Sequence, residues 1–216
     1  MRVQRIQARS EELLDPSGSA WQRLTAEEVT LAPTPIELQP TEYVRVAWQG
    51  RPYGALAKLQ VQGLHNGEKI FLRLSWEDAS QDDRIADINQ FSDAAAVLFP
   101  IAPDAPMAGM GLPGKPVNAW IWRPDWPGPK NVAIEGVGST QRRDDPSLAA
   151  SGSHADGRWQ VVLSRPFAAN GAPKGTVELA PGVPSRVGFA VWQGANQERA
   201  GIKAYSIDWI DLQVDA

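Results

Sequence analysis

The sequence predicts an all-β fold, a β-sandwich of two mainly antiparallel sheets with short helical turns and long loops. Hydrophobic residues alternate with polar ones over many short segments, which is typical of half-buried strands. The 216 residues include 19 glycines and 18 prolines, a composition that indicates short strands joined by many turns. Nine tryptophans are available to fill the core between the sheets. We expect residues 1–216 to form a single domain of roughly ten strands.

Two hairpins are the clearest elements. Residues 58–64 alternate in polarity, Asn66-Gly67 turns the chain, and residues 68–76 return with their apolar side chains on one face. Asn-Gly between alternating segments is a strong hairpin signal. A second hairpin is predicted at Asp156-Gly157, which leads into the alternating segment 158–163.

Further strands are expected wherever alternation recurs between turn residues. They are residues 29–31, 43–48, 94–99, 117–122, 131–137, 185–192 and 205–214. Short helical turns are expected at 10–14 and 82–91, and long loops at 100–114, 124–130 and 142–157. A loop as long as 100–114 within a compact domain is usually functional.

Composition and charge exclude several classes of function. The chain contains no cysteine, which excludes disulfides, thiolate zinc sites, iron–sulfur ligation and C-x-x-C-H haem attachment. The net charge of −4 does not predict a nucleic-acid-binding surface. No run of about 18 apolar residues is present, so no membrane-spanning helix is expected. The first residues lack the apolar core of a signal peptide, so the chain is cytosolic, already processed, or exported with a partner.

Motifs for catalysis and phosphate binding are weak. Gly109-x-Gly111-x-x-Gly114 matches a dinucleotide fingerprint in spacing, but Pro116 and a strand-like segment follow where a helix N-terminus is required. His65 and His154 lie in turn-like segments and are expected to be solvated. The same is expected of the carboxylate pairs at 77–78, 82–83 and 144–145. No nucleophile elbow or zinc-protease motif is present, so we do not expect the chain to be an enzyme in itself.

Met110 and Lys203 are the candidate metal ligands. The default role of a methionine is to fill gaps in the core. Met110 lies between Gly109 and Gly111, however, and glycines are used where the backbone must approach another group closely, so the alternative is a soft ligand. Lysine is normally a solvated surface charge. To bind a metal its amine must lose a proton, which costs about 4 to 5 kcal/mol at pH 7 unless burial lowers its pKa.

Several segments resemble one known family. They are LHNGEKIFLRLSW (64–76), Met-Gly-x4-Pro-Val-Asn-Ala-Trp (110–120), GFAVWQGANQERAG (188–201) and Lys-x-Tyr-Ser (203–206). From about residue 3 to residue 214 the sequence is similar to the haem b-binding gamma subunits of the ethylbenzene dehydrogenase and steroid C25 dehydrogenase group. That group belongs to the dimethyl sulfoxide reductase family of molybdoenzymes. The loops at 100–109, 124–130 and 142–157 are the least similar parts.

The resemblance implies an electron-transfer role. In that family a methionine and a lysine hold the iron of haem b, and these ligands fall on Met110 and Lys203 of this sequence. Further candidate cofactor-binding residues are Lys115, Asn118, Trp120 and Arg199. Asn118 and Trp120 have the same parity on their strand, so they share one face, which lies against either the haem or the core.

The implied assembly is a heterotrimer. Its molybdenum alpha subunit carries molybdopterin guanine dinucleotide and its beta subunit carries iron–sulfur clusters. This chain is expected to pass electrons between the iron–sulfur subunit and an external carrier such as a cytochrome c, and the implied location is the periplasm. The alternative function is a non-redox carbohydrate- or ligand-binding β-sandwich, in which the tryptophans form a stacking platform.

Overall fold

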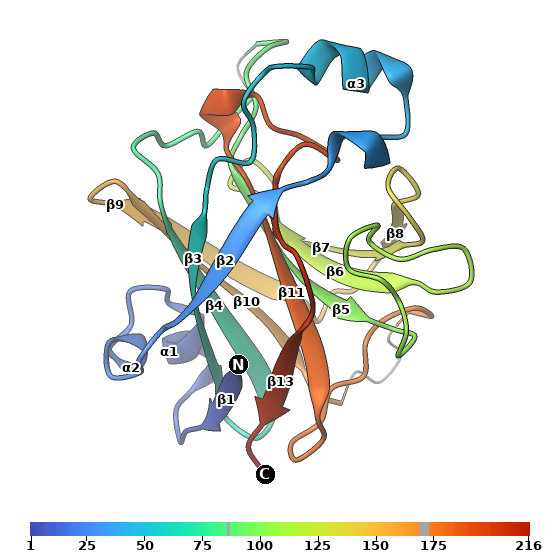
Figure 1. The fold of residues 1–216 in the computed structure, drawn as a ribbon. Helices are drawn as coiled ribbons and strands as arrows, with labels where there is room; N and C mark the ends of the chain where they lie inside the picture. The colour runs from blue at the N-terminus through green and yellow to red at the C-terminus, as the bar shows by residue number, and fades with distance from the viewer. Residues whose placement is uncertain (86, 169–172) are drawn as a thin grey trace.

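Two β-sheets pack face to face in the computed structural model, which describes residues 1–85, 87–168 and 173–216 (Figure 1). Their strands are β1 (Arg2–Arg5), β2 (Glu27–Pro33), β3 (Lys58–His65), β4 (Lys69–Glu77), β5 (Ala94–Pro100), β6 (Val117–Trp122), β7 (Lys130–Ile134), β8 (Gln141–Arg143), β9 (Ala149–Ala155), β10 (Arg158–Pro166), β11 (Ser185–Trp192), β12 (Ala204–Ser206) and β13 (Ile210–Val214). The predicted β-sandwich is confirmed.

The two sheets are joined by strand β2. The strand order is β8-β7-β6-β5-β11-β12-β2-β3-β4-β10-β9. Strand β2 contributes to both sheets, because its residues 27–30 pair with β3 and its residues 31–33 pair with β12. Strand β1 runs parallel to β3 and β13, whereas the other described strand pairs are antiparallel. The sheets are therefore mainly antiparallel, as the sequence predicts.

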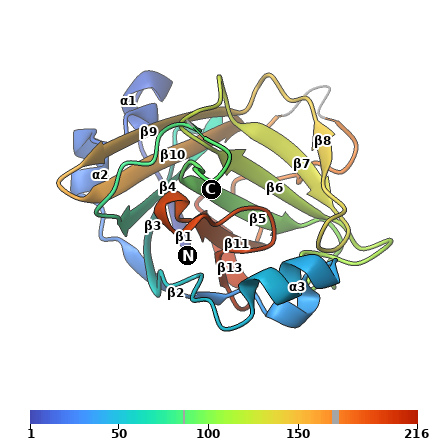
Figure 2. The same cartoon turned by 90° about the horizontal axis from the view of Figure 1, so that it is seen from above.

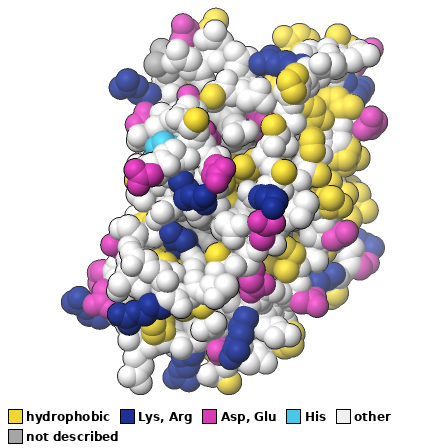
Figure 3. All heavy atoms as spheres, turned by 60° about the vertical axis from the view of Figure 1, so that its left-hand side comes forward, with side chains coloured by type: hydrophobic (Ala, Val, Ile, Leu, Met, Phe, Trp, Pro, Cys, Tyr) yellow, Lys and Arg dark blue, Asp and Glu magenta, His cyan; other side chains and the backbone are white. Residues whose placement is uncertain are grey.

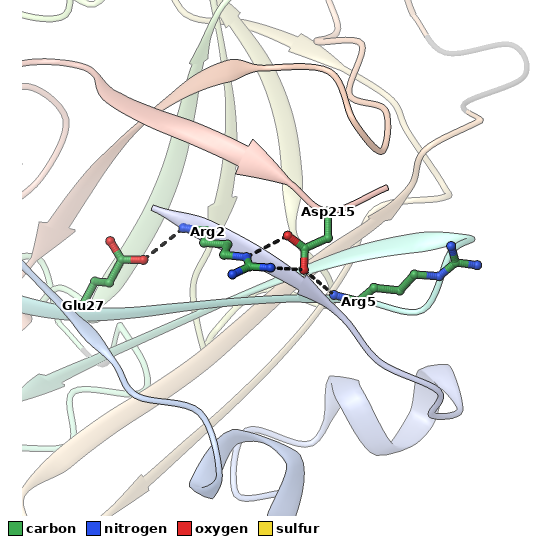
Figure 4. Close-up of polar contacts among 4 residues, drawn as sticks. All are labelled: Arg2, Arg5, Glu27 and Asp215. Atoms are coloured by element: carbon green, nitrogen blue, oxygen red, sulfur yellow. Dashed lines mark hydrogen bonds and ion pairs between the residues drawn. The ribbon is translucent and has the colours of Figure 1, made fainter.

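Strand β1 is held in place by charged groups at its edge (Figure 4). Arg2 Nε donates to Asp215 Oδ1 at 2.8 Å, and the backbone N–H of Arg2 donates to Glu27 Oε1 at 3.0 Å. The hydrogen bond from Arg2 lowers the pKa of the Asp215 carboxyl group. The sequence does not predict β1, because Val3 is the one buried side chain of this short strand.

The interior between the sheets is filled by aromatic and branched side chains. The ring centroids of Phe99 and Trp120 lie 4.7 Å apart, and those of Trp122 and Trp159 lie 5.1 Å apart. These two contacts involve three of the nine tryptophans, each of which buries a large apolar area between the sheets. Figure 2 shows the two layers from above, with β5, β6 and β7 in one and β4, β10 and β9 in the other.

Two short helices cover part of the outer face of the sheet that contains β3, β4 and β10. Helix α1 (Ser10–Leu14) occupies the segment predicted to be helical, and helix α2 (Ser19–Gln22) follows it. Leu13 and Trp21 of these helices pack against Phe71 of β4 and Val162 of β10. The helices thereby bury apolar side chains of β4 and β10 that point away from the core between the sheets.

The remainder of that outer face carries charges of both signs. Figure 3 shows Lys and Arg side chains next to Asp and Glu side chains on the side that faces left in Figure 1. The pairs there include Lys58 with Glu28 and Arg158 with Glu77, each with a nitrogen–oxygen distance of 3.0 Å. Such exposed pairs contribute little to stability.

Both predicted hairpins are present. Strands β3 and β4 are joined at Asn66-Gly67, where Gly67 has φ +90°. Strands β9 and β10 are joined at Asp156-Gly157, with φ +52° and +69°. In the second hairpin, positive φ at both central residues gives the turn the twist that adjacent antiparallel strands require.

The strand predicted at 43–48 is instead a helix, α3 (Glu42–Trp48). Thr41 precedes it, and the hydroxyl oxygen of Thr41 accepts a hydrogen bond from the backbone N–H of Val44 at 3.3 Å. This N-cap outweighs the β-propensity of the segment EYVRVAW. The side chains of Tyr43 and Val46 lie exposed on the helix, so their apolar character does not indicate burial.

Other boundaries differ from the prediction for local reasons. The predicted loop 142–157 contains β9, whose small Ala, Ser and Gly residues show little alternation. The predicted strand 205–214 is divided into β12 and β13. Over 82–91 the described residues form a turn and bends but no helix, and residue 86 lies outside the described residues.

Two side chains expected to be solvated are buried. His65 is 0% exposed, because β1 pairs alongside the end of β3. Burial lowers the pKa of the His65 imidazole. Asp78 is also buried, and its Oδ1 accepts hydrogen bonds from the backbone and the hydroxyl group of Ser80. Both residues lie next to strand ends, where sequence alone does not reveal what packs on top.

Candidate functional site

The candidate site is a cavity of about 140 Å³ on the outer face of the sheet β7-β6-β5-β11. The floor is formed by side chains that alternate with the buried core of the same strands. They include Ala96 and Leu98 of β5, Ala119 and Ile121 of β6, and Ala190 of β11. Three of these five are alanines, which leave space above the sheet because their side chains are single methyl groups. The remaining walls come from loops, and they contain both Met110 and Lys203.

Met110 is placed in the cavity by a tightly packed loop. Its backbone has φ +54°, a left-handed conformation that is uncommon for methionine. The next residue, Gly111, has φ +87°, and a Cβ there would lie 2.7 Å from the carbonyl oxygen of Ile134. Glycine is therefore required for the loop to approach strand β7. The Met110 side chain is 8% exposed and packs in the apolar cluster of this face.

The second loop methionine, Met107, has a different role. Its side chain is buried over Gly188, where a Cβ would lie 2.7 Å from the Met107 sulfur. Met107 is not among the side chains that line the cavity. Met107 is thus a core residue of the same apolar cluster, whereas Met110 faces the cavity.

Lys203 presents a buried amine to the cavity. The residue is 1% exposed, and its Nζ donates one long hydrogen bond, of 3.4 Å, to the carbonyl oxygen of Ala200. Among the described residues no carboxylate lies within 4.0 Å of Nζ, which lies 5.3 Å from the centroid of the Trp192 ring. Desolvation lowers the pKa of the Lys203 amine from 10.5 to about 7. A large fraction of this lysine is therefore uncharged near neutral pH, with a free lone pair.

The turn that carries Lys203 is fixed by hydrogen bonds to its carbonyl groups. The backbone N–H of Thr34 donates to the Lys203 oxygen at 3.0 Å, and Gln39 Nε2 donates to the Gly201 oxygen at 3.0 Å. Trp192 Nε1 donates to the Ala200 oxygen at 3.0 Å. Two of these donors belong to the segment that leads through η1 (Ile36–Leu38) to α3. This segment thereby fixes the turn from the side opposite to β11.

The four other predicted cofactor-binding residues are not all near the cavity. Asn118 and Trp120 point to the opposite face of β6, because their neighbours Ala119 and Ile121 face the cavity. Asn118 Nδ2 donates to Asn131 Oδ1 at 2.6 Å, and Trp120 packs in the core. These two residues therefore face the core between the sheets and not the cavity that contains Met110 and Lys203.

Lys115 and Arg199 both lie at the surface, with different neighbours. Lys115 forms an ion pair with Asp104 and is partly exposed. The guanidinium of Arg199 lies 4.3 Å from the centroid of the Phe91 ring. Arg199 lines a second pocket, of about 170 Å³, which shares Ile121, Trp192 and Ala200 with the Met110–Lys203 cavity. Arg199 thus lies beside the candidate site, whereas Lys115 lines neither pocket.

Sequence reasoning missed the residues that support the lysine turn. Trp192 lines both pockets, and the buried carboxylate of Glu198 accepts hydrogen bonds within the same turn. The segment NQERAG is polar, and nothing in its pattern indicates that Glu198 is buried. The described residues contain no group of three or more His, Cys, Asp or Glu side chains placed to hold a metal ion. No helix in the described part of the chain is long and apolar enough to cross a membrane.

Comparison with known proteins gives the family. The family model described as ethylbenzene dehydrogenase matches residues 18–145 and 134–204, which include both Met110 and Lys203. The chain belongs to the ethylbenzene dehydrogenase family. Its membership agrees with the resemblance noted in the sequence, because the matched residues include most of the segments that carry it.

Three similar proteins are named as subunits of two reductases and one dehydrogenase. The chain is 33% identical over 195 residues to "Putative respiratory nitrate reductase heme subunit ORF7" of Haloferax mediterranei, covering 90% of this chain and 66% of that protein. It is 31% identical to the chlorate reductase subunit gamma of Ideonella dechloratans, covering 92% of this chain and 78% of the relative. It is 30% identical to the dimethylsulfide dehydrogenase subunit gamma of Rhodovulum sulfidophilum, covering 91% and 73%.

Solved structures with the same fold belong to carbohydrate-binding proteins. A family 9 carbohydrate binding module from Caldicellulosiruptor kristjanssonii, in complex with glucose, aligns with a TM-score of 0.50 and 8% identity over 100% of this chain and 96% of that one. A "putative carbohydrate-binding protein" from Bacteroides uniformis aligns with a TM-score of 0.57 and 9% identity, covering 100% and 98%. At these identities the likeness concerns the β-sandwich fold alone.

Proposed function

We propose that residues 1–216 form one haem b-binding domain that transfers electrons, with Met110 and Lys203 as the axial ligands of the haem iron. One observation carries this proposal: a thioether and a buried amine whose pKa is lowered to about 7 line the same cavity. The family membership and the relative named as a heme subunit support it.

The donor set suits a haem iron. A thioether is neutral and needs no deprotonation, and it favours ferrous iron and raises the reduction potential. Deprotonation of an ordinary lysine at pH 7 costs about 4 to 5 kcal/mol, but burial has already lowered the pKa of Lys203 to about 7. The amine is thus available to a metal without a large further cost. When bound, haem b supplies a one-electron redox centre.

The lining of the cavity is mostly apolar, as a porphyrin ring requires, but at about 140 Å³ the cavity holds only part of such a ring, so haem binding would require the loops above the sheet to move. The alanine-rich floor leaves space, and the neighbouring pocket provides the exposed guanidinium of Arg199. We assign Arg199 to the haem carboxylates in preference to Lys115, because Lys115 is paired with Asp104. Asn118 and Trp120 support this site from below as part of the core.

We further propose that the chain works as the gamma subunit of a heterotrimer. The relatives named as gamma subunits of chlorate reductase and dimethylsulfide dehydrogenase support this assignment. The alpha subunit would carry molybdopterin guanine dinucleotide and perform the chemistry, and the beta subunit would carry iron–sulfur clusters. This chain exchanges electrons with the beta subunit and with an external carrier such as a cytochrome c. A periplasmic location fits that role.

The test compares Met110, which lines the cavity, with Met107, which does not. The full chain is loaded with haem b, and its absorption spectrum and iron content are measured. We expect about one iron per chain and a low-spin, six-coordinate spectrum. Met110→Leu and Lys203→Leu should each lose that spectrum, whereas Met107→Leu should retain it, because Met107 lies outside the cavity.

Two results would contradict the proposal. A chain that takes up no haem, remains colourless and instead binds sugars would favour the non-redox sandwich. Retention of the six-coordinate spectrum in both Met110→Leu and Lys203→Leu would show that the iron has other ligands.

A further inference from the structure

Glu198 is a buried carboxylate in the turn that leads from β11 to Lys203. It is 1% exposed, and no Lys, Arg or His nitrogen of the described residues lies within 4.0 Å of its oxygens. An unpaired buried charge is costly unless hydrogen bonds compensate for the lost solvation. The geometry around this carboxylate is therefore constrained.

Three donors converge on the Glu198 carboxylate. The backbone N–H of Gly54 donates to Oε1 at 2.6 Å, and Asn196 Nδ2 donates to the same oxygen at 2.9 Å. The backbone N–H of Gln193 donates to Oε2 at 3.0 Å. Hydrogen bonds to a charged acceptor are the stronger kind, so this arrangement resists distortion.

These donors come from two separate segments of the chain. Gln193 directly follows β11 and begins the turn that includes η2 (Gly194–Asn196). Gly54 belongs to a separate segment, and its backbone packs against the lysine: a Cβ at Gly54 would lie 2.8 Å from the Lys203 carbonyl oxygen. Gly54 has φ +59°, so glycine is required there for two reasons. Glu198 thus joins the turn that precedes Lys203 in the chain to the segment that packs on the Lys203 backbone.

A second buried carboxylate fixes the start of the same turn. Asp93 Oδ1 accepts from the backbone N–H of Gly194 at 2.8 Å, and Asp93 Oδ2 accepts from Trp159 Nε1 at 2.8 Å. The Asp93 contacts therefore anchor the turn to the core of the sandwich. Glu198 is the carboxylate that connects this anchored turn to the segment packed on Lys203.

We propose that Glu198 is a positioning residue for the Lys203 amine, holding the turn so that Nζ stays in the cavity with Met110. This inference rests on the proposed function, in which that amine is an iron ligand. Glu198 does not contact the cofactor. Its contribution is to fix the backbone from which the ligand projects, as residues beyond the direct ligands commonly do at metal sites.

The test uses the haem-loaded full chain and a matched control. Glu198→Ala removes the three hydrogen bonds, and we expect haem to dissociate on the order of tenfold faster. Its reduction potential and spectrum should move toward those of Lys203→Leu. Glu198→Gln keeps an oxygen acceptor for Gly54 and Asn196 and should fall between Glu198→Ala and the unmodified chain.

The control is Gln62→Ala. Gln62 is also buried, and its side chain also makes three hydrogen bonds, but these lie on the outer face of the other sheet. Gln62→Ala should unfold at lower denaturant concentration while keeping the potential of the unmodified chain. If Glu198→Ala does not fold, Glu198→Gln decides alone: a shifted potential supports the inference.

The inference is overturned if the folded Glu198 variants keep the unmodified potential and dissociation rate, or if Gln62→Ala shifts the potential equally. Failure of the proposed function looks different. In that case the unmodified chain itself shows no six-coordinate haem spectrum.

Discussion

The two faces of strand β6 differ in what they are built to hold. The inner face carries Asn118, Trp120 and Trp122, which fill the interior between the sheets. The outer face carries Ala119 and Ile121, which leave a cavity beneath the loops of Met110 and Lys203. Because side chains alternate along a strand, one short segment supplies both core side chains and part of the floor of the cavity. Stability and ligand binding should therefore be separable by substitutions one residue apart.

The largest effect is expected on the inner face. Trp120→Ala removes a fully buried ring that packs 4.7 Å from Phe99, so the free energy of unfolding should fall by about 3–5 kcal/mol. Chemical denaturation of the cofactor-free chain measures it. A loss below about 1 kcal/mol would mean that this face is not the core.

In the absence of haem, the buried Lys203 amine should lower the stability of the folded chain relative to the Lys203→Leu variant. The pKa of Lys203 is about 7 in the folded chain and near 10.5 when unfolded, so between these values the unfolded chain binds the extra proton. Stability should therefore rise as pH increases from about 7 to 10.5, and Lys203→Leu should remove that dependence. At pH 7 the same substitution should raise the free energy of unfolding by up to about 4 kcal/mol.

Denaturation at several pH values tests this prediction, with Lys58→Leu as the control for loss of an exposed lysine. Equal pH dependence in the unmodified chain and Lys203→Leu would show that the amine stays protonated. With haem bound, the order is expected to reverse, because the substitution then removes a ligand.

The smallest effect on stability, with a clear effect on binding, is expected on the outer face. Ala119→Leu places three further carbon atoms in the cavity of about 140 Å³ and should change the free energy of unfolding by about 1 kcal/mol or less. Haem uptake should fall by at least about tenfold, which corresponds to 1.4 kcal/mol. A haem titration monitored by absorbance measures the change. Unaltered uptake would place the cofactor elsewhere.

Much of the sheet framework can be predicted from the sequence because alternation is strong in buried strands. The bounds of β6 and β11 coincide with the predicted 117–122 and 185–192. Helix α3 is mispredicted, because a Thr41 cap decides between two conformations that the apolar pattern alone does not distinguish. Strand β9 is missed, because small residues that pack against tryptophans carry no alternating signal.

The site is predictable in part. Flanking glycines mark Met110, and their role in bringing the loop close to β7 follows from the packing at Gly111. The burial of Lys203 does not follow from its neighbours in sequence, because it depends on Thr34, Gln39 and Trp192, which are contributed by distant segments. The same holds for the face of Asn118 and Trp120, since strand parity pairs them but does not say which side is the core.

The most direct test of the central claim detects the lysine nitrogen on the iron. The full chain is labelled with ¹⁵N at the lysine side chains, loaded with haem b, and studied in the ferric state by pulsed electron paramagnetic resonance. One strongly coupled ¹⁵N nucleus is expected, and its signal should disappear in Lys203→Leu. A haem-loaded chain without a coupled lysine nitrogen, or with one that persists in that variant, would contradict it.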